Sequence, residues 1–229
     1  VKGVIGLPAN LFYGTGIPAC IIVLDKENAS ARTGIFMIDA SRGFKKDGNK
    51  NRLRDQDVHK IVDVFNNQKE TTKYSRMVNI SEIEANEYNL NIPRYIDGSE
   101  EEDLHDLYAH LNGGIPNSDI ENLNNFWEVF PILKNELFEA SKRDGYSQSK
   151  VEANEVKNTI LSSDEFIAFR TTTIKNYEKW KEKHHDRFYG LDVGMSTKQF
   201  IHEISEDLLN SFSNIKLIEK YDIYQILRE

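Results

Sequence analysis

Short apolar runs dominate the first forty residues of the chain. One run at residues 4–7 stops at Pro8, and another lies at 35–38. Between them, residues 17–24 are apolar throughout, which predicts a strand buried on both faces, as in the centre of a sheet covered by helices. Such strands need neighbours and covering helices, yet the next forty residues predict only one helix. We therefore expect this segment to be the end of a larger sheet.

That helix is predicted over residues 55–67. Residues 41–54, just before it, are rich in lysine, arginine and glycine and are predicted to be a basic loop. The apolar side chains of the helix follow the i, i+3, i+4, i+7 rule of a single helix face, and they are Val58, Ile61, Val62 and Phe65.

Three weaker signals follow the helix. Residues 74–80 favour a strand, and residues 81–84 (Ser-Glu-Ile-Glu) have the pattern of a capping box that opens a helix. Residues 88–95 alternate between polar and apolar and favour an extended segment that ends at Pro93.

The composition changes after residue 96. Residues 98–103 are mainly acidic and are the best boundary in the sequence, so we predict two domains, 1–96 and 97–229. Everything beyond this linker is expected to be helical. The signals for the helices are a capping box at 118–121 with a stop or kink at Pro131, apolar positions at 156–161, a long stretch at 163–188, a cap at Ser196, and an amphipathic stretch at 217–227.

The overall composition is that of a soluble globular protein, with 39% hydrophobic and 29% charged residues. No apolar run approaches the roughly 18 residues of a membrane span, and no secretory signal is present. The single cysteine, Cys20, lies in an apolar run and is expected to be a buried hydrophobe in a reducing cytoplasm. Because the first residue is valine, we expect a processed chain or a piece of a longer protein.

The formal net charge is −8. A chain this acidic does not hold nucleic acid by a general electrostatic field. If it works on DNA, a partner or a further domain has to supply most of the phosphate contacts.

Strong enzyme motifs are absent from the sequence. It contains neither G-x-G-x-x-G nor a P-loop. The adjacent His184 and His185 cannot share one helix face as zinc ligands, and we predict a solvated helix end there. The acidic residues 100–103 are predicted to be a solvated linker rather than a cation site. No catalytic residue and no metal ligand is predicted.

The most informative stretch is 4–26, VIGLPANLFYGTGIPACIIVLDK. It resembles the late strands of adenine-N6 methyltransferases, in the form found in the methyltransferase subunits of type I restriction–modification systems. That family has an Asn-Leu-Phe turn, a Gly-Thr-Gly-Ile loop and then a strand antiparallel to its sheet. The resemblance continues, in the family's order, through 34–51, 83–95, 110–130 and 221–227.

The resemblance implies the C-terminal part of a DNA methyltransferase subunit. The implied fold is a set of late, edge strands of a class I S-adenosylmethionine-dependent methyltransferase sheet, an α/β remnant, followed by a mainly helical region. The family's glycine motif for S-adenosylmethionine and its Asn-Pro-Pro-aromatic motif are absent from these 229 residues. We therefore expect no cofactor binding and no activity from this chain alone. The implied partners are a DNA-specificity subunit, a restriction subunit and double-stranded DNA, with no membrane.

The resemblance also implies one role in the loop after residue 7. An aromatic there packs against the target base once the base leaves the duplex. By its spacing from the apolar strand that residue is Phe12, with Tyr13 as the second candidate; a plug at the end of the sheet is the alternative. The basic residues that could meet DNA phosphates or a partner subunit, or simply be solvated, are Lys45, Lys46, Lys50, Arg52 and Arg54.

A rival interpretation of the sequence is a stand-alone helical interaction module without catalysis. In that reading the strands at the start are only a hairpin attached to a binding domain. The aromatic residues beyond 104 suit either a core or an interface, so they do not separate the two readings.

Overall fold

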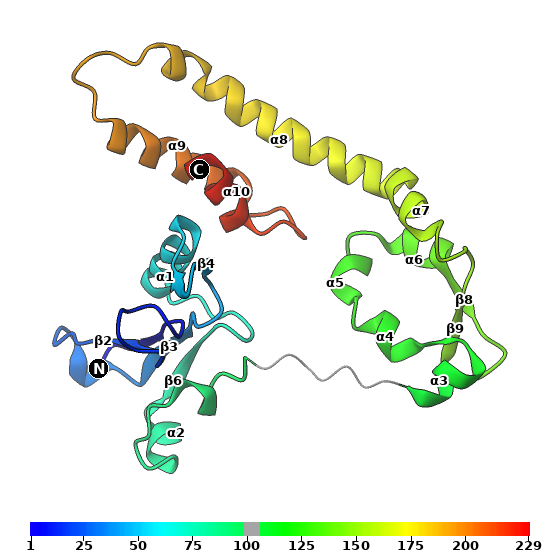
Figure 1. Ribbon diagram of the computed structural model, residues 1–229, viewed down its shortest axis with the longest axis horizontal. Coiled ribbons are helices and arrows are strands. Elements are labelled where there is room, and N and C mark those ends of the chain that lie inside the picture. The colour runs from blue at the N-terminus through cyan, green and yellow to red at the C-terminus, as the bar shows by residue number, and fades with distance from the viewer. Residues whose placement is uncertain (99–105) are drawn as a thin grey trace. The chain divides into compact units, whose positions relative to one another are not determined.

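The structure is a computed structural model that describes residues 1–98 and 106–229 (Figure 1). It divides into two compact units, one made of Val1–Glu101 with Tyr224–Glu229 and the other of Glu102–Ile223. The predicted acidic linker, apart from its first residue, lies outside the described residues, and so does the acidic cluster at 100–103. Among the described residues, no helix is both long and apolar enough to cross a membrane.

The first unit contains a mixed four-stranded sheet with the order β2-β1-β3-β6. β1 (Gly3–Gly6) lies between β2 (Cys20–Val23), which is antiparallel to it, and β3 (Gly34–Asp39), which is parallel to it. β6 (Ser75–Asn79) pairs with β3 in the antiparallel direction and confirms the strand predicted at 74–80. β2 is the strand that follows the Gly-Thr-Gly-Ile loop, and it is antiparallel to its neighbour β1, as the family resemblance implies.

Helices cover both faces of this sheet (Figure 1). Successive side chains of a strand point to opposite faces, so on β3 Phe36 and Ile38 pack toward α1 (Asp55–Asn67), whereas Met37 packs toward α2 (Ile80–Ala85). All three side chains are completely buried. β1 and β3 are thus held from both sides.

The strand β2 corrects the prediction of a fully buried central strand at 17–24. It pairs only with β1 among the described strands, and Ile21 and Ile22 are 47% and 53% exposed. Cys20 is also exposed rather than buried. An apolar run reveals that both faces of a strand are apolar, but not whether anything covers them.

Helix α1 has the predicted bounds and part of the predicted buried face. Ile61 is buried and Phe65 packs against the same core, whereas Val58 and Val62 are nearly half exposed. The buried face also includes Gln56, whose backbone N–H donates to the side chain of Gln225 at 3.1 Å. The last residues of the chain, far away in the sequence, therefore cover the start of α1.

The basic segment 41–54 contains a β-hairpin rather than only a loop. β4 (Lys45–Asp47) and β5 (Lys50–Arg52) are antiparallel, and Gly48 turns the chain between them with a φ of +61°. Its strands are polar, so no apolar alternation announced them.

Two further local predictions are wrong in detail. α2 begins at Ile80, and its N-cap residue Asn79 makes no side-chain capping bond, so the box expected at 81–84 does not form. The segment 88–95 is not extended throughout, because it contains the 3₁₀ turn η2 (Ile92–Arg94). A second 3₁₀ turn, η1, lies at Ala29–Ala31.

The second unit is not purely helical as predicted. It contains a small antiparallel sheet with the order β7-β9-β8, formed by Ile115–Pro116, Tyr146–Ser149 and Phe138–Ala140. These strands have two to four residues and no clear apolar alternation, so the sequence pattern does not identify them.

The helices of this unit follow the predicted caps only in part. Ser196 accepts a hydrogen bond from a backbone N–H of the helix that follows, as predicted, and Ser163 does the same for α8 although no cap was predicted there. The box at 118–121 does not form, and Pro131 opens a helix instead of ending one. The helices are α3 (Leu107–Asn112), α4 (Asn117–Glu121), α5 (Asn124–Trp127), α6 (Pro131–Leu137), α7 (Val156–Ser162), α8 (Asp164–Tyr189) and α9 (Thr197–Ser211). The last helix, α10 (Lys220–Arg228), begins in this unit, and its residues from Tyr224 onward belong to the first unit.

His184 corrects the prediction of a solvated histidine pair. It lies on α8, is only 3% exposed, and its Nε2 lies 2.7 Å from Oδ2 of Asp207 on α9. Its Nδ1 is buried with no hydrogen-bond partner among the described residues. Because a carboxylate only accepts, Nε2 is the donor of the hydrogen bond to Asp207. His185, in contrast, is exposed as predicted.

Asp207 should make the second unit sensitive to acid. A hydrogen bond from Lys183, and then one from His184, lower the pKa of this carboxyl. A lowered folded-state pKa gives stability that is present above the unfolded-state value and is lost as the pH falls through the folded-state value. Asp207→Asn should therefore cost about 0.5–1 kcal/mol at pH 7 and should flatten the loss of stability between about pH 5 and pH 2.

Urea unfolding at several pH values, followed by tryptophan fluorescence, measures this effect. Asp186→Asn is the matched control, because that carboxylate is on α8 and fully exposed. Equal pH profiles for the two variants would show that the contacts of Asp207 do not stabilise the fold.

Candidate nucleic-acid interface

The loop after β1 presents two aromatic side chains to solvent. Pro8 is buried and Leu11 packs against the core between the sheet and α1, so both fix the base of the loop. Phe12 and Tyr13 point away from this core, with 52% and 94% of their surface exposed. Phe12 therefore does not plug the end of the sheet, which was the alternative left open by its sequence position.

Left-handed backbone shapes the loop. Gly14 has a φ of +80°, which a side chain would strain. Asn10 has a φ of +56°, one of the few non-glycine residues that adopts this region readily. Its side-chain oxygen lies 3.1 Å from the place where a Cβ of Gly16 would be, so a side chain at Gly16 would crowd the start of the loop against its end.

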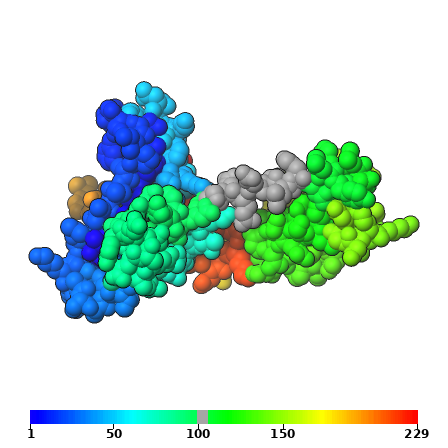
Figure 2. Space-filling view, turned by 90° about the horizontal axis from the view of Figure 1, so that it is seen from below, coloured from blue at the N-terminus to red at the C-terminus, as the bar shows by residue number. Residues whose placement is uncertain are grey.

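The hairpin β4–β5 lies against the same loop. β1 and β3 are parallel, with Gly6 opposite Asp39, so their carboxyl ends share one edge of the sheet. The loop follows β1 and the hairpin follows β3, and both connections leave from that edge. Figure 2 shows the dark-blue residues near the N-terminus beside the light-blue residues around position 50, in one projecting lobe.

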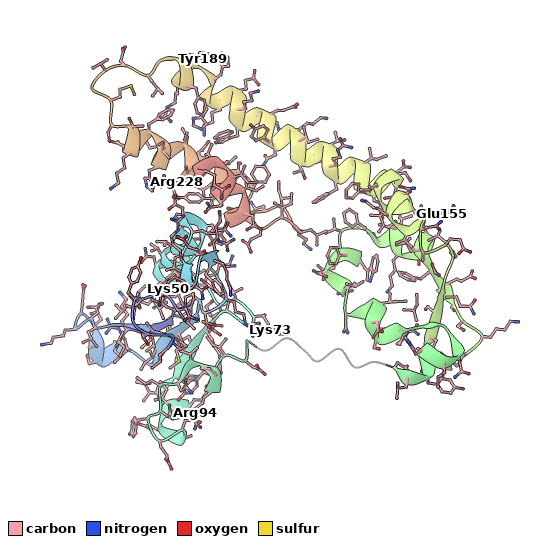
Figure 3. All side chains as sticks on the ribbon, viewed as in Figure 1. Lys50, Lys73, Arg94, Glu155, Tyr189 and Arg228 are labelled. Carbon is pink, nitrogen blue, oxygen red and sulfur yellow. The ribbon has the colours of Figure 1, made fainter. Side chains whose placement is uncertain are left out.

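Lys50 and Asn51 of this hairpin donate hydrogen bonds to the loop. The Nζ atom of Lys50 (labelled in Figure 3) lies 2.9 Å from the carbonyl oxygen of Phe12 and 3.5 Å from that of Thr15. The backbone N–H of Asn51 donates to the carbonyl of Asn10 at 2.9 Å, and its side-chain amide donates to another loop carbonyl at 2.7 Å.

The other predicted basic contacts have different surroundings. Lys45 and Lys46 are exposed on β4, where they could reach a phosphate. The guanidinium of Arg52 lies 3.9 Å from the carboxylate of Asp47 at the hairpin tip. Arg54 does not belong to this surface, because it makes two hydrogen bonds to a buried carboxylate at the start of α1.

The arrangement can bind a flat aromatic ring. An exposed aromatic face beside a cation suits stacking on a nucleobase, and the ammonium of Lys50 lies 6.0 Å from the ring centre of Tyr13. Within residues 1–98 and 106–229, no group of three or more histidine, cysteine or acidic side chains could hold a metal ion. The contacts of Lys50 and Asn51 were not predicted from the sequence, because nothing in it pairs them with the loop.

Comparisons with known proteins point to DNA methylases. Residues 1–104 match the family described as N-6 DNA methylase. The methylase subunit of the type I restriction enzyme MjaVII from Methanocaldococcus jannaschii is 36% identical over 115 residues, which are 48% of this chain and 20% of that protein. The methylase subunit of MpnII from Mycoplasma pneumoniae is 36% identical over 107 residues, 47% of this chain and 20% of that protein.

A third relative extends the similarity. The methylase subunit of MjaVIII, also from Methanocaldococcus jannaschii, is 32% identical over 146 residues, 61% of this chain and 24% of that protein. This segment is longer than either compact unit, so the similarity covers parts of both. A solved type I restriction–modification methyltransferase subunit from Streptococcus thermophilus is 40% identical, with a TM-score of 0.39 over 43% of this chain and 20% of that one.

The matched segments cover between a fifth and a quarter of the length of these curated relatives. The three curated relatives nevertheless agree, because each is the methylase subunit of a type I restriction enzyme. Residues 1–104 match the N-6 DNA methylase family, and the chain is similar to the methylase subunits of type I restriction enzymes.

Proposed function

We propose that this chain is the C-terminal part of a DNA adenine-N6 methyltransferase subunit in a type I restriction–modification complex, and that it carries the surface that holds the target base. The observation that carries the proposal is the exposed Phe12, on a loop at the carboxyl edge of two parallel strands, within the residues that match the N-6 DNA methylase family. Ligands of open α/β sheets generally bind at this edge.

The energetics suit this role. A base that leaves the duplex loses its stacking neighbours at a cost of a few kcal/mol. Stacking on an aromatic side chain returns about 1–3 kcal/mol. Phe12 offers a face that is already exposed, so no core contact has to break before the base arrives. Tyr13, which is more exposed still, remains the second candidate.

The methyl-transfer chemistry needs residues that this chain does not contain. S-adenosylmethionine would supply the methyl group, but neither the family's cofactor motif nor its Asn-Pro-Pro-aromatic motif occurs in these 229 residues. No residue of this chain is therefore assigned to the cofactor, and the chain alone is inactive. Its own contribution is to stack the extruded adenine and to orient the amino group.

The four-stranded sheet is, in this proposal, the late part of a class I methyltransferase sheet. The edge strand supports this, because Ile21 and Ile22 alternate to opposite faces of β2 and both are about half exposed. Leu24, just beyond the strand, is 75% exposed. Apolar side chains on both faces of an exposed edge suit a strand covered by further protein.

The second unit is proposed to dock the DNA-specificity subunit, with a restriction subunit joining the complex. The similarity to methylase subunits that extends into this unit supports the assignment. Several large apolar side chains are exposed on its short first helix, α3, including Leu107 at 74% and Leu111 at 83%. The net charge of −8 supports a complex in which other subunits hold most DNA phosphates.

The test is Phe12→Ala in the complete methyltransferase complex. Loss of stacking should lower kcat/KM for methylation of a cognate duplex roughly 5–150-fold, the equivalent of about 1–3 kcal/mol. Phe12→Tyr keeps an aromatic ring and with it most of the stacking energy. Its kcat/KM should therefore stay within about threefold of that of the parent. With 2-aminopurine in place of the target adenine, the alanine variant should fluoresce more strongly, because the flipped base is no longer stacked.

Tyr88→Ala is the control, since Tyr88 is also an exposed aromatic of the first unit, at 68%, but is not in the loop. It should leave kcat/KM unchanged. A loss for Tyr13→Ala with no loss for Phe12→Ala would assign the stacking role to Tyr13. No loss in either variant would rule out base stacking by this loop.

A further inference from the structure

The carbonyl groups of the aromatic loop are held from one side by the hairpin β4–β5. Lys50 donates to the carbonyls of Phe12 and Thr15, and Asn51 donates to those of Ala9 and Asn10. Four loop carbonyls therefore point toward two consecutive residues of β5. The aromatic side chains are left exposed.

Lys50 occupies the critical place in this network. Its ammonium bridges two carbonyls that flank Tyr13 and Gly14, the exposed tip of the loop. A backbone with two glycines in five residues loses much conformational entropy when it is ordered. Hydrogen bonds from a charged donor are stronger than neutral ones, and here they fix the ends of the flexible segment. Thr15 adds a local bond, because its hydroxyl accepts from the N–H of Ile17 at 3.1 Å.

We infer that Lys50 is a positioning residue that preorganises the aromatic loop for the target base, an inference that rests on the function proposed above. The ammonium has three donors, and two of them face loop carbonyls. A lysine that bound a DNA phosphate directly would have to share or give up these bonds. The geometry favours a role inside the protein over the phosphate contact that its place in a basic segment suggested.

The first experiment uses this 229-residue chain without DNA. Lys50→Met keeps the aliphatic stem and removes the donors. Backbone ¹⁵N order parameters of the amides of residues 12–16 should fall from rigid values near ~0.85 to below ~0.6. Lys46→Met, on the neighbouring strand and exposed, is the matched control and should leave them unchanged. Unchanged order in Lys50→Met would overturn the inference, whatever the enzyme does.

The second experiment uses the methyltransferase complex. If Lys50 positions the loop, Lys50→Met should lower kcat roughly tenfold, because a misplaced contact in a reacting complex costs up to about a hundredfold. The KM for DNA and the dependence of binding on salt should not change. A direct phosphate contact would instead raise KM for DNA and reduce the slope of log K against log salt by about one, and that result would overturn the inference.

The result for Phe12→Ala separates this inference from the proposed function. If Phe12→Ala lowers kcat/KM but Lys50→Met leaves kcat unchanged, Lys50 is not a positioning residue and the proposed function stands. If neither Phe12→Ala nor Tyr13→Ala affects methylation, the base-packing function fails and the role of Lys50 fails with it. If Lys50→Met loses loop order and lowers kcat at constant KM, the result supports both the positioning role of Lys50 and the proposed function.

Discussion

Replacing Phe36 with alanine should lower the free energy of unfolding of the first unit by about 3–5 kcal/mol. Phe36 is completely buried on β3, the strand between β1 and β6. Its ring meets the ring of Phe65 edge to face at 6.2 Å and lies in one core with Ile61 and Val64 of α1. Truncation removes the ring and leaves a cavity between sheet and helix that the rigid strand pairings on both sides cannot close.

Hydrogen exchange of the β3 amides is the appropriate measurement, because both tryptophans, Trp127 and Trp180, lie in the other unit. Phe12→Ala is the matched control within the same unit: Phe12 is 52% exposed, so its loss should change the free energy of unfolding by less than ~0.5 kcal/mol. A cost below about 1 kcal/mol for Phe36→Ala would contradict the two-sided core. The two variants also separate stability from function, since only Phe12 is proposed to contact the base.

The parts of the fold that the sequence predicts well are those set by local spacing. The helix at 55–67 has its expected bounds, and Ser196 caps the helix that it precedes. Both signals depend on residues within one or two turns of each other, so no distant contact is needed to read them.

The errors arise where distant contacts decide burial. The apolar run at 17–24 reads as a central strand, but the described residues cover only one of its edges and leave Ile21 and Ile22 half exposed. His184 is predicted to be solvated because it is polar and near a helix end, yet it is buried, and its Nε2 is hydrogen-bonded to a carboxylate 23 residues later. The sheet of the second unit has very short strands that carry no periodic signal.

The candidate site shows the same division. Phe12 and the two loop glycines that follow it are close in sequence, and the family resemblance places the aromatic in its loop. The support from Lys50 and Asn51 comes from residues 35 to 42 positions later. It becomes visible only once β1 and β3 are known to be parallel, because that pairing brings the loop and the hairpin to one edge.

Replacing Trp180 with alanine should destabilise the second unit by about 3–5 kcal/mol. Trp180 is 5% exposed on α8, and its indole N–H donates to the carbonyl of Ile204 on α9 at 3.2 Å. The rings of Tyr177, His184 and Phe188 lie 5.4 to 6.2 Å from it. Alanine removes this packing and also the hydrogen bond from the indole to α9, and both losses act against folding.

Urea unfolding followed by the fluorescence of the remaining Trp127 measures this loss within the second unit. Trp180→Phe isolates the hydrogen bond from the packing and should cost about 1 kcal/mol for the lost N–H donor, plus the smaller ring. Tyr189→Ala is the control on the same helix (labelled in Figure 3), because this side chain is 83% exposed and should change stability by less than ~0.5 kcal/mol. If Trp180→Ala were as mild as that control, α8 and α9 would not share a core around the indole.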